Sequence, residues 1–129
     1  MDFKAEIEYW EDKNGHSPIT DFLLKEVPAN HLAWIKKRDH DFLEKLTVRE
    51  LFSTPYLDWA EGVDYPLIEV RYLGKGAKNY RALAFVWNQD LIYLDFFKGS
   101  GSDGRLAKHF LKSITRAEDW KQRYPKAKT

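Results

Sequence analysis

The chain has 129 residues and 43% hydrophobic content, which suffices for one hydrophobic core and argues against a second full domain. It has no cysteine, so disulfides, thiol nucleophiles and thiolate metal sites are excluded. The net charge of +1 conceals an asymmetry, because residues 1–66 carry 8 basic and 14 acidic residues whereas residues 67–129 carry 13 and 6. We therefore predict a single domain over residues 1–129 whose carboxyl-terminal half has the charge of a phosphate binder.

The first part of the chain predicts a strand followed by a helix. Residues 3–10, FKAEIEYW, alternate between apolar and polar side chains over most of their length, which is typical of an amphipathic strand. Ser17 directly before Pro18 is a favourable helix start, because the serine hydroxyl can cap free amide groups and proline fits the first helical position. We expect that helix to end near Glu26.

A second and longer helix is expected from about Ala29 to Leu46. The Asp-His-Asp run at 39–41 does not predict a metal site, because adjacent helical positions point about 100° apart, and we expect these side chains to be solvated. Thr47 with Glu50 three residues later predicts a further short helical turn with a capped start. Residues 55–66 are expected to be irregular.

The sequence period then changes to that of strands. Residues 67–73, 80–88 and 90–98 read as three successive strands joined by short turns, which predicts a β-meander. Residues 105–124 resume a helical period, and His109 in this helix is expected to be structural or solvent-facing because it has no partner at metal-ligand spacing. The predicted fold is α+β, in the order β-α-α-β-β-β-α, with a mostly antiparallel sheet flanked by helices.

Positive charge is concentrated in the predicted hairpin RYLGKGAKNYR at residues 71–81. Arg71 and Arg81 flank the hairpin and can face each other across the sheet if they share a face. Two neighbouring guanidiniums repel unless an anion lies between them, so the pair indicates a phosphate site. Lys75 and Lys78 lie in the turn, where they either contact a phosphate backbone or are simply solvated.

A resemblance to a known family rests on four segments in the second half of the chain. With the order of elements, these segments resemble the phage-derived branch of the RelE/HigB superfamily of toxins from type II toxin-antitoxin modules, over most of the chain up to about Tyr124. The segments are IEVRY, NYRALAFVW, LIYLDFFKGS and LAKHFLKSITRAEDW. Within them, the matching motifs are Val70–Arg71, Tyr80–Arg81 and Phe96–Lys98.

The resemblance implies an mRNA endoribonuclease that acts at the ribosome without a metal ion or cofactor, and that a helix-turn-helix antitoxin silences. The ribose 2′-hydroxyl would attack the adjacent phosphate while cationic side chains stabilise the added negative charge. The implied catalytic residues are Arg71, Arg81 and Lys98. The implied RNA- or ribosome-binding residues are Lys75, Lys78, Tyr80, Arg105 and Lys108.

Simpler interpretations of the same residues remain open at this point. The hairpin arginines can form cross-strand ion pairs with Glu69 or Asp95. Lys98 can protect the end of a strand, and Tyr80 can belong to the sheet core rather than stack on a base.

Two alternatives for the whole protein also remain. Leu94 and Gly99 stand where many relatives carry a histidine and a second lysine, which favours a phage or prophage protein that binds RNA, ribosome or another protein without cleavage. The basic half can also serve only to dock an acidic antitoxin. With no long apolar run and no signal-peptide pattern at the start, we expect a cytoplasmic protein without a membrane partner.

Overall fold

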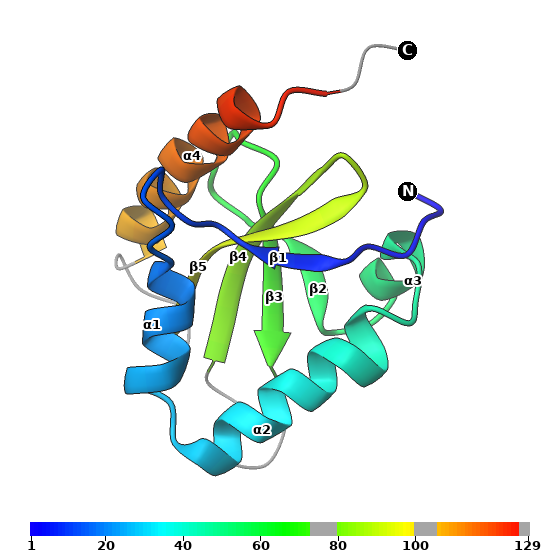
Figure 1. Ribbon diagram of the computed structural model, residues 1–129. Coiled ribbons are helices and arrows are strands. Elements are labelled where there is room, and N and C mark those ends of the chain that lie inside the picture. Colours follow the sequence, from blue (N-terminus) through cyan, green and yellow to red (C-terminus); the bar gives the residue numbers. More distant parts are fainter. Residues whose placement is uncertain (73–79, 100–105, 127–129) are drawn as a thin grey trace.

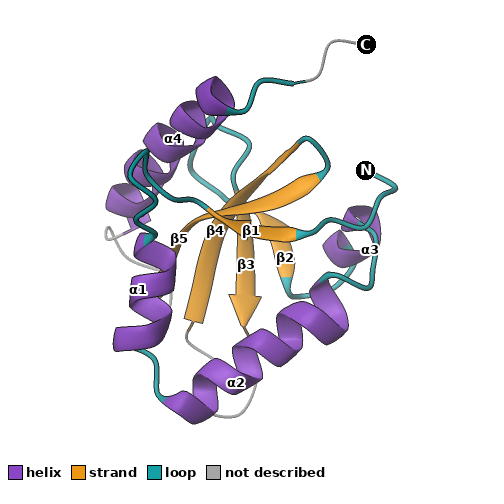
Figure 2. Cartoon of the chain, in the orientation of Figure 1, coloured by secondary structure: helices purple, strands orange, loops and turns teal. Residues whose placement is uncertain are grey.

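A computed structural model describes residues 1–72, 80–99 and 106–126. The fold is α+β and contains a mixed five-stranded sheet. Figures 1 and 2 show the sheet with helices packed around it. The strands, in their spatial order, are β1 (Ile7–Tyr9), β5 (Asp90–Lys98), β4 (Tyr80–Trp87), β3 (Ile68–Tyr72) and β2 (Leu57–Trp59).

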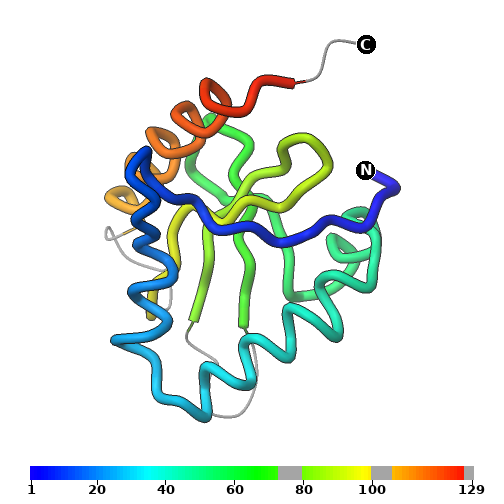
Figure 3. Tube along the Cα trace, viewed as in Figure 1, coloured from blue at the N-terminus to red at the C-terminus, as the bar shows by residue number. Residues whose placement is uncertain are grey.

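Strand pairing confirms the predicted meander and the mostly antiparallel sheet. β3, β4 and β5 pair antiparallel in succession, and β2 extends the sheet by pairing antiparallel with β3. β1 alone among the described strands runs parallel to its neighbour, which is β5. The trace in Figure 3 shows the amino-terminal segment lying against the β4–β5 hairpin. Strand β2 lies in the region predicted to be irregular, so that prediction was wrong at Leu57–Trp59.

The helices begin close to the predicted positions. Their bounds are α1 (Pro18–Lys25), α2 (Ala29–Arg38), α3 (Val48–Phe52) and α4 (Leu106–Arg123), and a π-helical turn, η1 (Asp39–Leu43), follows α2. The Ser17 hydroxyl accepts a hydrogen bond from the Thr20 amide at 3.2 Å, which confirms the predicted cap of α1. Thr47 and Glu50 form the predicted reciprocal cap of α3. No helix in the described ranges combines the length and apolar character of a membrane span.

The sheet divides the core into two parts. We call the side covered by α1 and α2 the α2 face and the side covered by α4 the α4 face. The core on the α2 face includes Ile35, Val70, Tyr72, Ala82 and Tyr93. The core on the α4 face comprises Leu67, Phe85, Ile92, Leu94, Ala117 and Trp120. Because successive strand residues point to opposite faces, polar residues between these apolar ones are assigned to a face by their position.

A bulge in β5 adjusts that alternation. Leu83 pairs with Asp95, whereas its neighbour Ala84 pairs with Tyr93, so Leu94 has no partner in the β4 register. Leu94 and Asp95 consequently both lie on the α4 face, where Leu94 joins the core and Asp95 contacts α4.

Candidate functional site

Arg71 and Arg81 lie directly opposite each other on β3 and β4. Both point to the α4 face, because Tyr72 and Tyr80 beside them point to the α2 face. Arg71 Nε donates a hydrogen bond to Glu69 Oε1 at 2.9 Å, and Arg81 Nη1 donates to the same oxygen. The cross-strand ion pair with Glu69 is therefore present, and it holds the two guanidiniums side by side.

The two arginines line a groove of about 470 Å³ between the sheet, the edge strand β2 and the first turns of α4. We call it the arginine groove. Its lining residues are Trp59, Glu61, Gly62, Glu69, Arg71, Arg81, Leu106 and Phe110. The arginine side chains are 31% and 22% exposed, whereas the Glu69 side chain is only 9% exposed. The cationic groups thus face the groove while their shared carboxylate lies beneath them.

Trp59 is an aromatic residue of the groove that the sequence did not indicate. It pairs with Ile68, so its side chain leaves β2 toward the α2 face and reaches the groove at the edge of the sheet. Its side chain is 46% exposed, and its ring stacks on Phe52 with the centroids 4.8 Å apart. One face of the ring is therefore supported by the protein while much of the residue remains accessible. The signal was weak, because LDW at 57–59 is too short to predict a strand and the charge beside the tryptophan is that of an acid, Asp58, whose carboxylate lies 3.7 Å from Arg71 Nη2.

Asp95 forms a second ion-paired centre on the α4 face. Its carboxylate is buried and contacts His109 Nδ1 at 2.5 Å, with Arg116 Nη1 at 3.7 Å and Lys112 Nζ at 3.9 Å. The His109 ring stacks on Phe97 with a centroid distance of 3.8 Å. His109 is therefore structural, which is one of the two roles expected for it, and not solvent-facing. Asp95 is bound by α4 and not by the hairpin arginines.

Lys98 lies on the other face of the sheet from the two arginines. It pairs with Tyr80 in the β4–β5 register, and its Nζ lies 5.8 Å from the centroid of the Tyr80 ring. The Tyr80 hydroxyl forms a 3.2 Å hydrogen bond with Nδ1 of His31. Tyr80 itself is only 2% exposed, so it belongs to the core and offers no free ring face for stacking on a base. The structure therefore brings Arg71 and Arg81 together but separates them from Lys98.

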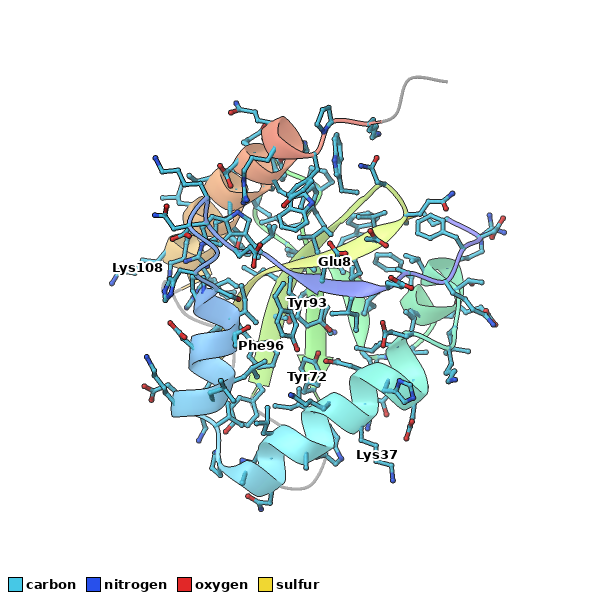
Figure 4. All side chains as sticks on the ribbon, viewed as in Figure 1. Glu8, Lys37, Tyr72, Tyr93, Phe96 and Lys108 are labelled. Atoms are coloured by element: carbon cyan, nitrogen blue, oxygen red, sulfur yellow. The ribbon has the colours of Figure 1, made fainter. Side chains whose placement is uncertain are left out.

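The remaining predicted binding residues are spread along other segments. Lys108 is exposed on α4 and points outward in Figure 4. Lys75, Lys78 and Arg105 lie outside the described residues.

Asp39 corrects an expectation from the sequence, because it is buried at 7% exposure instead of solvated. The Tyr72 hydroxyl donates to Asp39 Oδ1 at 2.5 Å. The Tyr93 hydroxyl donates to the Tyr72 hydroxyl at 2.5 Å and makes a longer, 3.3 Å contact with the same Asp39 oxygen. Figure 4 labels both tyrosines in the interior, between the sheet and α2. Burial raises the pKa of Asp39 to about 7, although both hydrogen bonds act to lower that pKa. A signal was available, since Asp39 lies four residues after Ile35 and four before Leu43 on the apolar stripe.

Comparisons with known proteins give no further assignment, because neither a family model nor a curated protein matches the sequence.

Proposed function

We propose that the protein is a toxin of the RelE/HigB type that binds single-stranded mRNA in the arginine groove and cleaves it without a metal ion. One observation carries this proposal: Arg71, Arg81 and the exposed Trp59 line the same groove. Proteins that bind single-stranded nucleic acids combine cationic groups along the backbone with aromatic rings on which bases stack.

The arginine pair supplies the phosphate-binding part of the proposal. Glu69 accepts one hydrogen bond from each guanidinium, so each retains further N–H groups that can donate to phosphate oxygens. Holding two guanidiniums together before RNA binds also removes part of the entropic cost of ordering them. Glu69 in this arrangement positions the arginines.

The groove also supplies a position for a base. Phe52 supports one side of Trp59, so a base of a strand that passes over the β2 edge of the sheet can stack on the accessible part of the ring while a phosphate of the same strand contacts the arginines. A base inside a duplex is already stacked on its neighbours, which is why the proposal specifies a single strand.

In the proposed reaction, the ribose 2′-oxygen loses its proton and bonds to the adjacent phosphorus. The bond from phosphorus to the 5′-oxygen of the next nucleotide breaks, and that oxygen takes up a proton. Arg71 and Arg81 stabilise the added negative charge on the phosphate oxygens. Lys98 has no place in this groove, so the proposal assigns the electrostatic role to the arginine pair alone.

The RelE-like topology, the ribosome as the site of action, the cytoplasmic location and a helix-turn-helix antitoxin belong to the same proposal. The element order supports it, since the predicted β-α-α-β-β-β-α series is present with α3 and β2 inserted before β3.

A second candidate function is RNA binding without cleavage. The observation that favours it is the position of Lys98 on the α2 face, which leaves the groove without the lysine expected for a three-residue catalytic set.

The decisive experiment is induction of the wild type and the Arg81→Ala variant in bacteria, followed by growth measurement and primer-extension mapping of 5′ ends on a reporter mRNA. Arg49→Ala is the matched control, because Arg49 is exposed and its ion pair is with Asp2, away from the groove. We expect growth arrest and new 5′ ends with the wild type and the control, and neither with Arg81→Ala. Circular dichroism of each purified variant checks that it folds.

Binding of a fluorescent single-stranded RNA at several salt concentrations separates the two candidates. Affinity that falls with salt and is reduced about five- to a hundredfold by Trp59→Ala supports RNA binding in the groove. RNA binding without arrest or new 5′ ends supports the non-catalytic candidate. If the folded wild type neither binds RNA nor arrests growth, both candidates are wrong.

A further inference from the structure

A second cavity lies at the other end of α4 from the arginine groove. It has a volume of about 540 Å³ and is formed by β1 and the residues after it, the β4–β5 hairpin and the last turns of α4. Figure 4 labels Glu8 on β1 beside this hairpin. Its lining residues are Glu8, Tyr9, Glu11, Trp87, Asn88, Asp90, Trp120 and Tyr124. We call it the acidic cavity.

Three carboxylates line the acidic cavity, and none of its described lining residues is basic. Burial raises the pKa of Glu8, and repulsion from Asp90 adds to that rise. Burial also raises the pKa of Asp90, with a contribution from Glu6. Burial and mutual repulsion therefore disfavour negative charge at Glu8 and Asp90, and a cation bound beside them would offset this. Glu8 and Glu11 belong to the acidic half of the sequence and do not line the arginine groove.

Aromatic rings form much of the remaining wall, and contacts within the protein hold them in place. The Trp120 and Tyr124 rings lie 4.5 Å apart, and the Trp87 indole N–H donates to the Tyr124 carbonyl oxygen at 2.6 Å. Cations of the same chain lie over these rings, since Lys126 Nζ is 4.8 Å from the centroid of the Trp87 ring and Arg123 is 5.6 Å from that of Trp120. A cationic ligand at Trp87 therefore has to displace the Lys126 ammonium. Such rings favour a ligand that presents both positive charge and an apolar body.

The arrangement of the carboxylates distinguishes an extended cation from a metal ion. Across the described part of the chain, no three carboxylate or histidine side chains are close enough together to hold a metal ion. The three carboxylates of the cavity therefore do not form a metal-binding group. A ligand with several cationic groups separated by methylene units can reach them individually while its methylene units cover the aromatic rings.

We propose that the acidic cavity binds an aliphatic polyamine. Its ammonium groups pair with Glu8, Glu11 and Asp90, and its carbon chain lies against Trp87 and Tyr124. The site is separate from the arginine groove, and the proposal does not depend on the RNA-binding function.

Isothermal titration calorimetry with spermidine at low ionic strength tests the proposal, with amide NMR spectra to locate the site. We expect saturable binding and shifts at Glu8, Asn88 and Asp90. The Glu8→Gln/Asp90→Asn double variant should weaken binding about four- to twenty-fivefold, at about two- to fivefold for each exposed ion pair removed. Trp87→Leu should weaken binding about two- to fivefold, because it removes the aromatic surface against which the carbon chain and its neighbouring ammonium groups lie.

The control variant is Glu26→Gln, which removes one negative charge from an exposed position outside the cavity. It should leave spermidine affinity unchanged, and magnesium chloride should not reproduce the NMR shifts. The double variant should still fold, because the raised pKa values of Glu8 and Asp90 indicate that neutral side chains suit these positions. Absence of saturable binding overturns the proposal. So does equal weakening by Glu26→Gln, or the same shifts with magnesium, since either indicates general attraction to an acidic surface.

Discussion

Asp39 and Asp95 are both buried at 7% exposure, one on each face of the same sheet, yet the protein accommodates them differently. Asp39 on the α2 face receives hydrogen bonds from the hydroxyls of Tyr72 and Tyr93. Asp95 on the α4 face is surrounded by His109, Lys112 and Arg116. Only the second arrangement brings opposite charge to the carboxylate.

The difference shows how charge is distributed between the two faces. On the α2 face the buried acid is held by neutral groups, and its pKa rises to about 7 because burial disfavours the carboxylate. On the α4 face, Asp95 is bound by cations of α4, and Glu69 is shared by Arg71 and Arg81. Cationic side chains therefore gather on the α4 face, which is also the face of the arginine groove.

The largest effect should come from Asp95→Ala. The substitution leaves the buried part of Arg116 without its carboxylate partner, and loss of one partner of a buried pair costs about 3 to 5 kcal/mol of unfolding free energy. Urea denaturation at pH 7 measures this loss. Lys112→Ala is the control, because its 47% exposed side chain should contribute less than about 1 kcal/mol. Equal losses for the two variants would contradict the pairing described for Asp95.

The pH dependence of the unfolding free energy should show the raised pKa of Asp39. Its pKa is raised from 3.8 to about 7, so the folded protein retains a proton that the unfolded chain releases, and stability falls as pH rises through this window. At about 1.4 kcal/mol per pKa unit, the loss between pH 4 and pH 8 is about 4 kcal/mol. The measurement is urea denaturation across this pH range for the wild type and Asp39→Asn. The variant should lack this component of the pH dependence, and parallel curves would refute the assignment to Asp39.

The smallest of the three effects concerns the hydroxyl groups around Asp39. Tyr72→Phe removes the donor at 2.5 Å and should cost about 1 to 3 kcal/mol at pH 8, where Asp39 is ionised. At pH 4 the cost should be smaller, because protonated Asp39 needs fewer donors. Tyr93→Phe removes both the 3.3 Å bond to Asp39 and the 2.5 Å bond to the Tyr72 hydroxyl, so it should also cost about 1 to 3 kcal/mol at pH 8. A Tyr72→Phe cost that does not change with pH would indicate lost packing alone.

Local signals in the sequence account for much of the fold. The alternating residues of β3, β4 and β5 predicted the meander, and the caps at Ser17 and Thr47 marked helix starts. Strand β2 was missed because its three residues carry no period of their own, and it exists through pairing with β3.

The candidate site was only partly accessible from the sequence for a similar reason. Strand order made the opposition of Arg71 and Arg81 foreseeable, and it is present. The contribution of Trp59 depends on β2, and the partners of Asp95 depend on how α4 packs over the sheet. The prediction that Asp39 is solvated was wrong, because it followed the charged residues next to Asp39 in the sequence. The spacing of four residues from Ile35 indicates the buried side of the helix instead.

The bulge at Leu94 has a consequence for the end of β5, where it reverses the parity of every later residue. Counted in steps of two from Tyr93, an unbulged strand would carry Asp95 and Phe97 on the α2 face and Lys98 on the α4 face. The extra residue instead sends the Lys98 ammonium toward Tyr80. The bulge at Leu94 therefore places the Lys98 ammonium on the opposite face of the sheet from Arg71 and Arg81. Without the bulge, the same three side chains would lie on one face.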